Sequence, residues 1–250
     1  MDFQNKRVII TGGSSGIGRA LAQALLQRGA RVVVCGRDAA RLDAALTQLP
    51  GAEGVVCDLT EPRELSHLAE EALARLGGLD LLIHNAAIQQ ALSLATAPSE
   101  GREELGERMA RELTLNLIAP LRLTALCVDA LRHGVEPAVM HVTSVLAHSP
   151  KASAPAYCAS KAGLRSATHS LRHQLAPLGI QLVELVPPVV DTEMTRGRSE
   201  PGKLSPLSVA EAALHGLARG ALEIHVGRAR TAAWLGRIAP GLLARKLIAS

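Results

Sequence analysis

The sequence contains almost no aromatic side chains. Phe3, Tyr157 and Trp234 are the only ones among 250 residues. The core must therefore be built from Leu, Ala, Val and Ile, and we expect a substrate pocket lined mainly by aliphatic side chains. Proteins that bind single-stranded nucleic acid stack bases on aromatic rings, so this composition argues against a nucleic-acid partner.

Cysteine is also scarce, and the four residues Cys35, Cys57, Cys127 and Cys158 show no CxxC or metal-binding spacing. We interpret them as reduced, buried thiols of a cytoplasmic protein. No apolar leader precedes the first predicted strand, and no uncharged apolar run approaches the roughly 20 residues that a membrane span needs. We therefore expect a soluble protein without a transmembrane segment.

What the chain does contain is a regular alternation of apolar strand-like runs and helical segments. Hydrophobic residues make up 48% of the sequence, which suits a sizeable globular core. Continuous apolar strands separated by helices are typical of a parallel sheet covered on both faces. The predicted fold class is α/β, a single domain with a doubly wound parallel sheet over residues 1–227.

A glycine-rich turn follows the first predicted strand, residues 7–11. Gly12, Gly16 and Gly18 stand in this turn, and a helical pattern covers residues 19–26. Glycines let the backbone approach a pyrophosphate, and the N-terminus of the helix favours negative charge. The pattern indicates the phosphate-binding turn of a Rossmann fold, although a tight turn that merely needs glycine remains an alternative.

The second predicted strand, residues 31–35, leads to Gly36, Arg37 and Asp38. A dinucleotide-binding fold reads the adenosine ribose here, with an acid for a free 2′-hydroxyl or an arginine for a 2′-phosphate. Arg37 therefore favours NADP(H) over NAD(H), although it is alternatively a solvated surface arginine. Asp38 is expected to cap the helix at residues 39–46.

Two further predicted strands end in polar or small residues. Residues 54–58 end in Asp58, which either accepts from an adenine amino group or caps a turn, and Thr60 is expected to cap a helix at 62–75. Residues 79–84 lead into Asn85, Ala86 and Ala87. Their small side chains leave room for a nicotinamide ribose, or simply mark a strand-to-loop exit.

Asn116 lies inside a long helical pattern over residues 102–131, four positions before Pro120. Asparagine has poor helix propensity, and proline removes a backbone donor. The pair predicts a local distortion of the helix that holds a water molecule. The alternative is a polar residue tolerated on the exposed face.

The pattern with the clearest chemistry joins Tyr157, the only tyrosine, to Lys161 one helical turn later. An ammonium near a phenol favours the phenolate, which suits a general acid/base. Ser144 ends the predicted strand 138–143, where its hydroxyl is placed to hold a carbonyl oxygen. An ordinary core tyrosine and a turn serine are the alternatives.

After a predicted strand at residues 180–186, a segment rich in Gly, Pro and charge covers about residues 187–206 and is the predicted substrate lid. A helix at 208–218 and a strand at 223–226 complete the alternation. Residues 228–250 form a basic, amphipathic tail that is not an independent domain. We expect it to pack on its own domain or a second subunit, with a membrane surface as the alternative.

His169 and His173 share one helix face. No carboxylate or cysteine joins them in the sequence pattern, so we expect a surface or interface role for this pair. The sequence predicts no metal site.

The motifs, taken in order, resemble the short-chain dehydrogenase/reductase family over about residues 5–227. The resemblance implies a catalytic tetrad of Asn116, Ser144, Tyr157 and Lys161. The resemblance also implies a set of cofactor-binding residues, several of which are discussed above. The set is Gly12, Ser14, Ser15, Gly16, Ile17, Gly18, Arg37, Asp58, Leu59, Asn85, Ala86, Ala87, Tyr157, Lys161, Pro187, Val190 and Thr192.

In that family the tyrosine exchanges the proton, the serine orients the carbonyl, and the lysine binds the nicotinamide ribose and tunes the tyrosine. The asparagine holds a water of the proton relay, while Val190 and Thr192 would meet the carboxamide. The segment 157–175 and the paired prolines are similar to a bacterial subgroup, the short-chain oxidoreductases of lipoteichoic acid D-alanylation operons.

The resemblance implies an NADP(H)-dependent oxidoreductase that interconverts a small or medium aliphatic carbonyl and a secondary alcohol. It also implies a homodimer or homotetramer paired through the long helices after the fourth and fifth strands. Ala87 and Pro188 stand where the family usually has glycine. These two departures motivate the alternative of an NADP(H)-binding sensor or scaffold without turnover.

Overall fold

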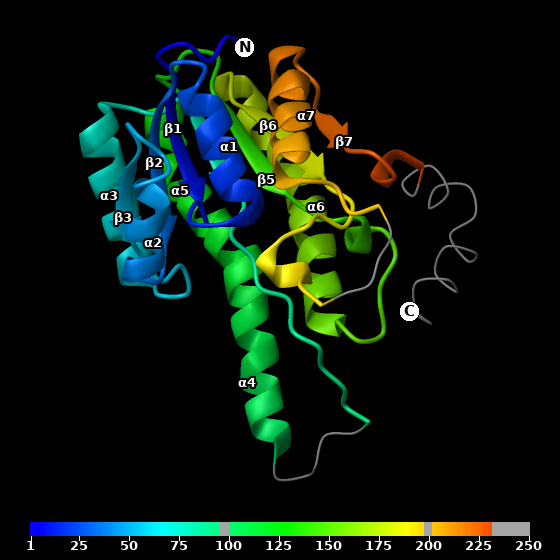
Figure 1. Ribbon diagram of the computed structural model, residues 1–250. Coiled ribbons are helices and arrows are strands. Elements are labelled where there is room, and N and C mark those ends of the chain that lie inside the picture. The colour runs from blue at the N-terminus through cyan, green and yellow to red at the C-terminus, as the bar shows by residue number, and fades with distance from the viewer. Residues whose placement is uncertain (96–100, 198–201, 232–250) are drawn as a thin grey trace.

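The computed structural model describes residues 1–95, 101–197 and 202–231 (Figure 1). Seven strands form one sheet in the order β3-β2-β1-β4-β5-β6-β7, and every neighbouring pair is parallel. The strands are β1 (Arg7–Thr11), β2 (Arg31–Gly36), β3 (Glu53–Val56), β4 (Leu81–His84), β5 (Ala138–Val142), β6 (Gln181–Val186) and β7 (Glu223–His225). The predicted doubly wound parallel sheet is confirmed.

Helices connect successive strands and cover both faces of the sheet. They are α1 (Gly16–Leu26), α2 (Ala39–Leu46), α3 (Pro62–Leu76), α4 (Arg102–Leu113), the π-helix η2 (Thr114–Ile118), α5 (Ala119–Leu131), α6 (Pro155–Leu175) and α7 (Pro206–Ala218). Short 3₁₀ turns are η3 (Val145–Ala147), η4 (Ala176–Leu178) and η5 (Glu193–Thr195).

Two aliphatic core clusters lie on opposite faces of the sheet. Alternate strand residues such as Ile10 and Ile9 point to different clusters, because successive side chains of a strand face opposite ways. Helices α1, α2 and α7 cover one face, and α3, α5 and the end of α6 cover the other. Figure 1 shows α1 beside α7, while α4 projects beyond the sheet.

Strand order places a topological switch point between β1 and β4. The chain runs outward from β1 to β3 and then crosses back to β4 on the other side of β1. Ligands of open α/β sheets bind outside the carboxyl ends of the strands at such a point. We therefore expect a ligand site at the loops after β1, β4 and β5.

Local signals place most helix ends to within a few residues. Asp38 caps α2 as predicted, since its Oδ1 accepts from the Arg41 amide at 3.0 Å. The prediction that Thr60 caps α3 is wrong: Glu61 is the N-cap, and the Thr60 hydroxyl donates to Asp58 at 2.7 Å. Helix α6 begins at Pro155, because proline suits the first helical turn.

The predicted distortion at Asn116 is confirmed as the π-helical turn η2 between α4 and α5. Asn116 is fully buried, so the alternative of an exposed polar residue is wrong. The continuous helix Arg102–Leu131 is long and apolar enough to cross a membrane by length and composition, a test that core helices also pass. Here Leu123, Cys127 and Leu131 pack into the core of the sheet.

Candidate active site

A cavity of about 390 Å³ opens along the carboxyl ends of the strands at the switch point. Most residues expected at the site line it: Gly12, Ser14, Ser15, Gly16, Ile17, Arg37, Asp58, Leu59, Asn85, Ala86, Ala87, Ser144, Tyr157, Lys161, Pro187, Val190 and Thr192. Gly18 and Asn116 do not line the cavity. Both lie behind its wall and hold other residues in place.

The glycine turn after β1 is shaped by close backbone contacts. Gly12 has φ +66°, and a β-carbon there would lie 2.9 Å from the Ala86 Cα. A β-carbon at Gly18 would lie 2.2 Å from the Gly12 carbonyl oxygen and 2.4 Å from Asn85 Nδ2. Only glycine fits these positions, so the turn stays close to the start of α1.

Asn85 locks the loop after β4 onto this turn. Its Nδ2 donates to the carbonyl oxygens of Thr11 and Gly12, both at 3.1 Å. The Thr11 hydroxyl in turn accepts from the amides of Asn85 and Ala86 at 3.0 and 3.1 Å. The side chain of Asn85 is therefore structural here, and the loop presents Ala86 and Ala87 to the cavity.

Where β2 and β3 end, two arginines and one carboxylate line the cavity. Arg111, from α4, pairs with Asp58 at 2.8 Å, and Arg37 also lines the cavity. Burial would raise the pKa of the Asp58 carboxyl, but the hydrogen bonds from Thr60 and the charges of Arg111 and Arg37 outweigh it and lower the pKa. A second carboxylate is close by, because Glu64 Oε2 accepts from the Asp58 amide at 2.6 Å. The motifs did not identify Arg111, which only the tertiary structure brings here.

Tyr157 and Lys161 lie one turn apart at the start of α6, and both are buried. The lysine Nζ is 5.8 Å from the centre of the tyrosine ring and donates to the Val142 carbonyl at 2.7 Å. Burial lowers the pKa of Lys161 from 10.5 to about 8. An ammonium with this low pKa readily exchanges a proton near neutral pH.

Asn116 connects the π-helical turn to the cavity wall. Its Oδ1 accepts from the Ile88 amide at 2.9 Å, and its Nδ2 donates to the Ile88 carbonyl at 2.8 Å and to Ser160 Oγ at 3.1 Å. The Ser160 hydroxyl donates to the Tyr157 carbonyl at 2.8 Å. Asn116 thus links the loop after β4 to the helix that carries the tyrosine.

Ser144 follows β5 and begins the turn η3. Its backbone is extended, and its Oγ accepts from the Leu146 amide at 3.2 Å. The neighbouring Thr143 hydroxyl donates to Glu184 on β6 at 2.7 Å, which fixes the chain just before the serine. The Ser144 hydroxyl therefore stands in the cavity at the same end as Tyr157 and Lys161.

Family membership follows once the chain is compared with known proteins. The family of short chain dehydrogenases matches residues 6–202, most of the chain. This protein belongs to the short-chain dehydrogenase family. It is an NAD(P)-dependent oxidoreductase of that family, as the sequence motifs implied.

Several relatives of this short-chain dehydrogenase are known. The protein named uncharacterized oxidoreductase DltE of Bacillus subtilis (strain 168) is 41% identical over 199 residues, which cover 78% of this chain and 76% of that protein. The 3-oxoacyl-[acyl-carrier-protein] reductase FabG of Escherichia coli (strain K12) is 30% identical over 207 residues, 80% of each chain. The expected likeness to the DltE subgroup is therefore confirmed.

A solved structure extends the likeness over the whole chain. It is a short-chain dehydrogenase from Burkholderia cenocepacia J2315 in complex with NADP, with 27% sequence identity and a TM-score of 0.85. The match covers 99% of both chains. The arrangement of sheet and helices in the described residues is thus that of a short-chain dehydrogenase.

The cavity of this short-chain dehydrogenase suits a dinucleotide. At one end, Gly12 and Gly16 have positive φ, which leaves the turn without side chains that would block a diphosphate. Ala86 and Ala87 also line the cavity, and their small side chains leave room in it. The shape and the charges agree with the residues that the family resemblance implied.

Part of the predicted lid, residues 187–206, lies outside the described residues. The described part is folded over the cavity: Thr192 and Thr195 form a capping box around η5, and Lys203 Nζ donates to the Thr195 carbonyl at 2.8 Å. Glu193 pairs with Arg41 on α2 at 2.8 Å. Of the predicted tail 228–250, only residues 228–231 are described.

Two buried histidines behind the cavity were not singled out by sequence reasoning. His84 and His141 are cross-strand partners on β4 and β5, with ring centres 5.0 Å apart. Their outer partners are Thr124 at 2.9 Å and Thr168 at 2.7 Å. Burial lowers both pKa values, that of His141 to about 3, so both imidazoles are neutral. They add no charge next to Lys161.

Proposed function

We propose that this protein is an NADP(H)-dependent oxidoreductase that interconverts a carbonyl and a secondary alcohol, with Tyr157 as the general acid/base. The observation that carries the proposal is one continuous cavity with a glycine turn at one end and Tyr157, Lys161 and Ser144 at the other. A dinucleotide held by the turn would bring its nicotinamide toward these three side chains. When bound, the nicotinamide would donate or accept the hydride.

Side chains of this protein would transfer the proton. In the reductive direction the Tyr157 hydroxyl gives its proton to the carbonyl oxygen, while the Ser144 hydroxyl donates a hydrogen bond to the same oxygen. Lys161, whose pKa is lowered to about 8 by burial, favours the phenolate that remains and binds the nicotinamide ribose. Asn116 would hold a relay water, and Val190 and Thr192 would meet the carboxamide.

The preference for NADP(H) rests on charge at the adenosine end. Arg37 and Arg111 line this part of the cavity, where their guanidinium groups would make charge-assisted hydrogen bonds to a 2′-phosphate. Asp38, the acid nearest Arg37 in sequence, has its Oδ1 engaged by the Arg41 amide. Asp38 therefore serves as the N-cap of α2.

The substrate would be small or medium in size and mainly aliphatic. Apolar side chains surround the catalytic end of the cavity, among them Ile88, Leu115, Val145, Leu146 and Met194. Such side chains favour binding of hydrocarbon, while Ser144 and Tyr157 would orient the carbonyl.

We also propose a cytoplasmic homodimer or homotetramer. The family resemblance pairs the long helices after the fourth and fifth strands between subunits. Ile118 and Leu126 on this long helix are 39% and 45% exposed, which leaves apolar surface for a second copy. Sedimentation analysis of the purified protein measures the state directly, and a monomer at micromolar concentration contradicts the proposal.

Turnover with NADPH and a panel of aliphatic ketones tests the activity. Tyr157→Phe removes the acidic proton but keeps the ring, so we expect kcat to fall by about 10³-fold with NADPH binding retained. Unchanged turnover in this variant removes Tyr157 from the mechanism. Tight NADPH binding without turnover on a broad panel instead supports the alternative of a sensor or scaffold.

Arg37→Ala tests the cofactor preference separately. Loss of one charge-assisted contact to a phosphate should weaken NADPH binding by about 10-fold and leave NADH binding nearly unchanged. Fluorescence titration of both nucleotides measures the ratio. Equal losses for both nucleotides would mean that Arg37 does not read the 2′-position.

A further inference from the structure

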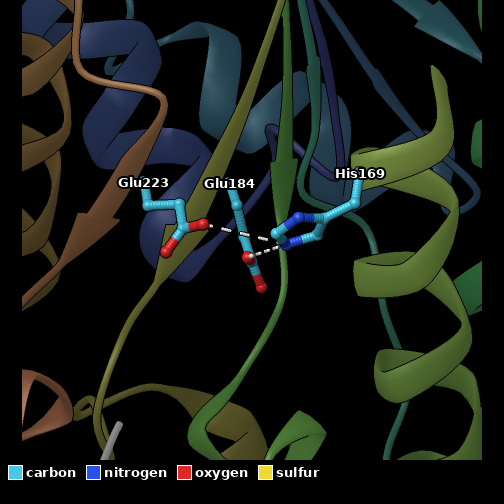
Figure 2. Close-up of side chains that lie close together, drawn as sticks. All are labelled: His169, Glu184 and Glu223. Carbon is cyan, nitrogen blue, oxygen red and sulfur yellow. Dashed lines mark ion pairs between the residues drawn. The ribbon is translucent and has the colours of Figure 1, made fainter. Parts of the chain in front are cut away.

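A cluster of ligand-type side chains lies on the far side of β6 from the glycine turn. His169 projects from α6 toward Glu184 on β6 and Glu223 on β7 (Figure 2). The prediction that no carboxylate joins His169 is wrong, because the sheet brings in two carboxylates that are distant in sequence. His173, one turn further along α6, does not belong to the cluster among the described residues.

The strand register explains why the two carboxylates meet. Glu184 and Glu223 are direct partners in the parallel pairing of β6 with β7, so their side chains emerge on the same face of the sheet. Helix α6 packs on this face and supplies His169. The His169 Nε2 lies 3.5 Å from Glu184 Oε2 and 3.8 Å from Glu223 Oε1 (Figure 2).

Glu184 is the feature that points to a ligand. Its side chain is fully buried, and only one of its oxygens has a hydrogen-bond partner: Oε1 accepts from Thr143 at 2.7 Å. Oε2 is buried without such a partner and faces His169, whose Nε2 is likewise buried without a hydrogen bond. Two unsatisfied ligand atoms that face each other are costly unless something bridges them.

The charges around this point leave room for a cation. Arg165 Nε lies 3.7 Å from Glu184 Oε2, which is too long for a hydrogen bond but offsets one negative charge. The cluster thus has two carboxylates, Glu184 and Glu223, against the one guanidinium of Arg165. The rings of His148 and His225 lie 6.1 Å apart nearby, and burial is the main cause of the lowered pKa of His148.

We propose that His169, Glu184 and Glu223 bind a divalent first-row transition metal ion of the Zn²⁺ type. The ligands are His169 Nε2 and one oxygen of each carboxylate, and all three lie within 4.8 Å of one another. Tetrahedral Zn²⁺ with bonds of about 2.0–2.1 Å separates its ligand atoms by roughly 3.3 Å, so the two carboxylates must move toward His169 and toward each other, by at most about 1.5 Å, to complete the site. Water takes the fourth position.

The mixture of ligands selects the class of ion. Imidazole suits Zn²⁺ and its neighbours in the first transition row, whereas Mg²⁺ and Ca²⁺ take oxygen ligands almost exclusively. The metal has a structural role in this proposal, because it ties α6, β6 and β7 together at the edge of the sheet. It is separate from the proton chemistry at Tyr157, although the Glu184 carboxylate also holds Thr143, the neighbour of Ser144.

Metal binding is measured on the full-length, untagged protein after removal of metal with EDTA. We expect isothermal titration with Zn²⁺ to give one site per chain, and a Tm rise of about 5 °C or more at a hundredfold excess over Kd. Co²⁺ should give the strong visible absorption of a four-coordinate site, whereas Mg²⁺ should produce no change. If the protein shows no 1:1 binding of Zn²⁺ or Co²⁺, the proposal is wrong.

Matched variants assign the binding to this cluster. His169→Gln and Glu223→Gln should each weaken Zn²⁺ binding by about 100-fold or more, while NADPH binding and circular dichroism confirm that they fold. His173→Gln is the control, since it removes an exposed imidazole from the same helix, and it should bind like the wild type. Wild-type affinity in His169→Gln would place the metal elsewhere and overturn the proposal.

Discussion

The two ends of the cavity are built in different ways. The dinucleotide end is made of backbone, because Gly12, Gly16 and Gly18 leave no side chain between the turn and the loops packed around it. The catalytic end is made of buried polar side chains, in which Asn116 and Lys161 hydrogen-bond to backbone groups of other segments. The dinucleotide end requires positions without a β-carbon, and the catalytic end requires specific hydrogen-bond partners.

This difference explains how each end tolerates change. A backbone-built turn has no side chain that can give way, so an added methyl group collides with fixed atoms. In a polar network, each hydrogen bond that is removed lowers the free energy of unfolding by a limited amount and leaves a buried polar group unpaired. We therefore expect the largest effects on stability at the dinucleotide end and graded effects at the catalytic end.

Gly18→Ala should have the largest effect. Its β-carbon would lie 2.2 Å from the Gly12 carbonyl oxygen, so the variant should lose about 3 kcal/mol of unfolding free energy together with nucleotide binding. Gly106→Ala on α4 is the control, because that glycine is exposed with no atom within 4 Å of the added carbon. The free energy of unfolding of Gly106→Ala should rise by up to about 1 kcal/mol, because alanine favours a helix more than glycine does. Urea denaturation of both variants measures the contrast, and equal stabilities would refute it.

Asn116→Leu should have an intermediate effect at the catalytic end. The change keeps the volume but leaves both Ile88 backbone groups without the amide side chain, at a cost of about 2 kcal/mol and a lower kcat. Ser160→Ala, which removes only one of the three partners of Asn116, should cost about half as much. A larger loss in Ser160→Ala would show that the Ile88 contacts are unimportant.

Lys161→Met should show that the catalytic end is maintained at a cost to stability. The folded state lowers the lysine pKa from 10.5 to about 8, so between these pH values the unfolded state binds more protons and wild-type stability rises with pH. The loss of unfolding free energy caused by burying the charged lysine is fully present below pH 8 and absent above pH 10.5.

Lys161→Met should therefore lose activity. At pH 7 its free energy of unfolding should be higher by about 1 kcal/mol, or about 3 °C in Tm, after allowance for the lost hydrogen bond to the Val142 carbonyl. The gain should disappear by pH 10.5. Thermal denaturation from pH 7 to 10.5 tests this, and a gain that does not vary with pH would mean that lysine ionisation is not its cause.

Glu193→Gln should have the smallest effect, because the ion pair with Arg41 joins the lid to α2 at the surface. The two side chains are 46% and 62% exposed, so the pair contributes less than about 1 kcal/mol and is weakened by salt. We expect Tm to change by no more than about 2 °C and the KM for NADPH to rise at most threefold. Asp129→Asn, which breaks a surface pair away from the cavity, is the control. Identical KM values in both variants would show that the lid does not need this contact.

The fold and much of the candidate site could be predicted from local patterns. The apolar runs and the glycine turn identify the strands and the order of the motifs, and Tyr157 and Lys161 meet because residues four apart share a helix face. Arg111, His141 and Glu184 could not be assigned roles in this way. Each gains its partner from a segment more than 25 residues away, and the pattern around each is that of an ordinary helix or buried strand.

The sequence by itself determined the parallel α/β architecture, the family and the places of the glycine turn and the tyrosine–lysine pair, because these follow from short-range periodicity and spacing. Only the tertiary structure decided that Asp58 lies between Arg37 and Arg111, that Asn116 holds Ile88 across the cavity wall, and that His169 meets two carboxylates. The physical reason is long-range packing, both the register of the strands and the docking of helices on the sheet. Which side chains become neighbours across a sheet depends on long-range pairing, and no local pattern along the chain contains it.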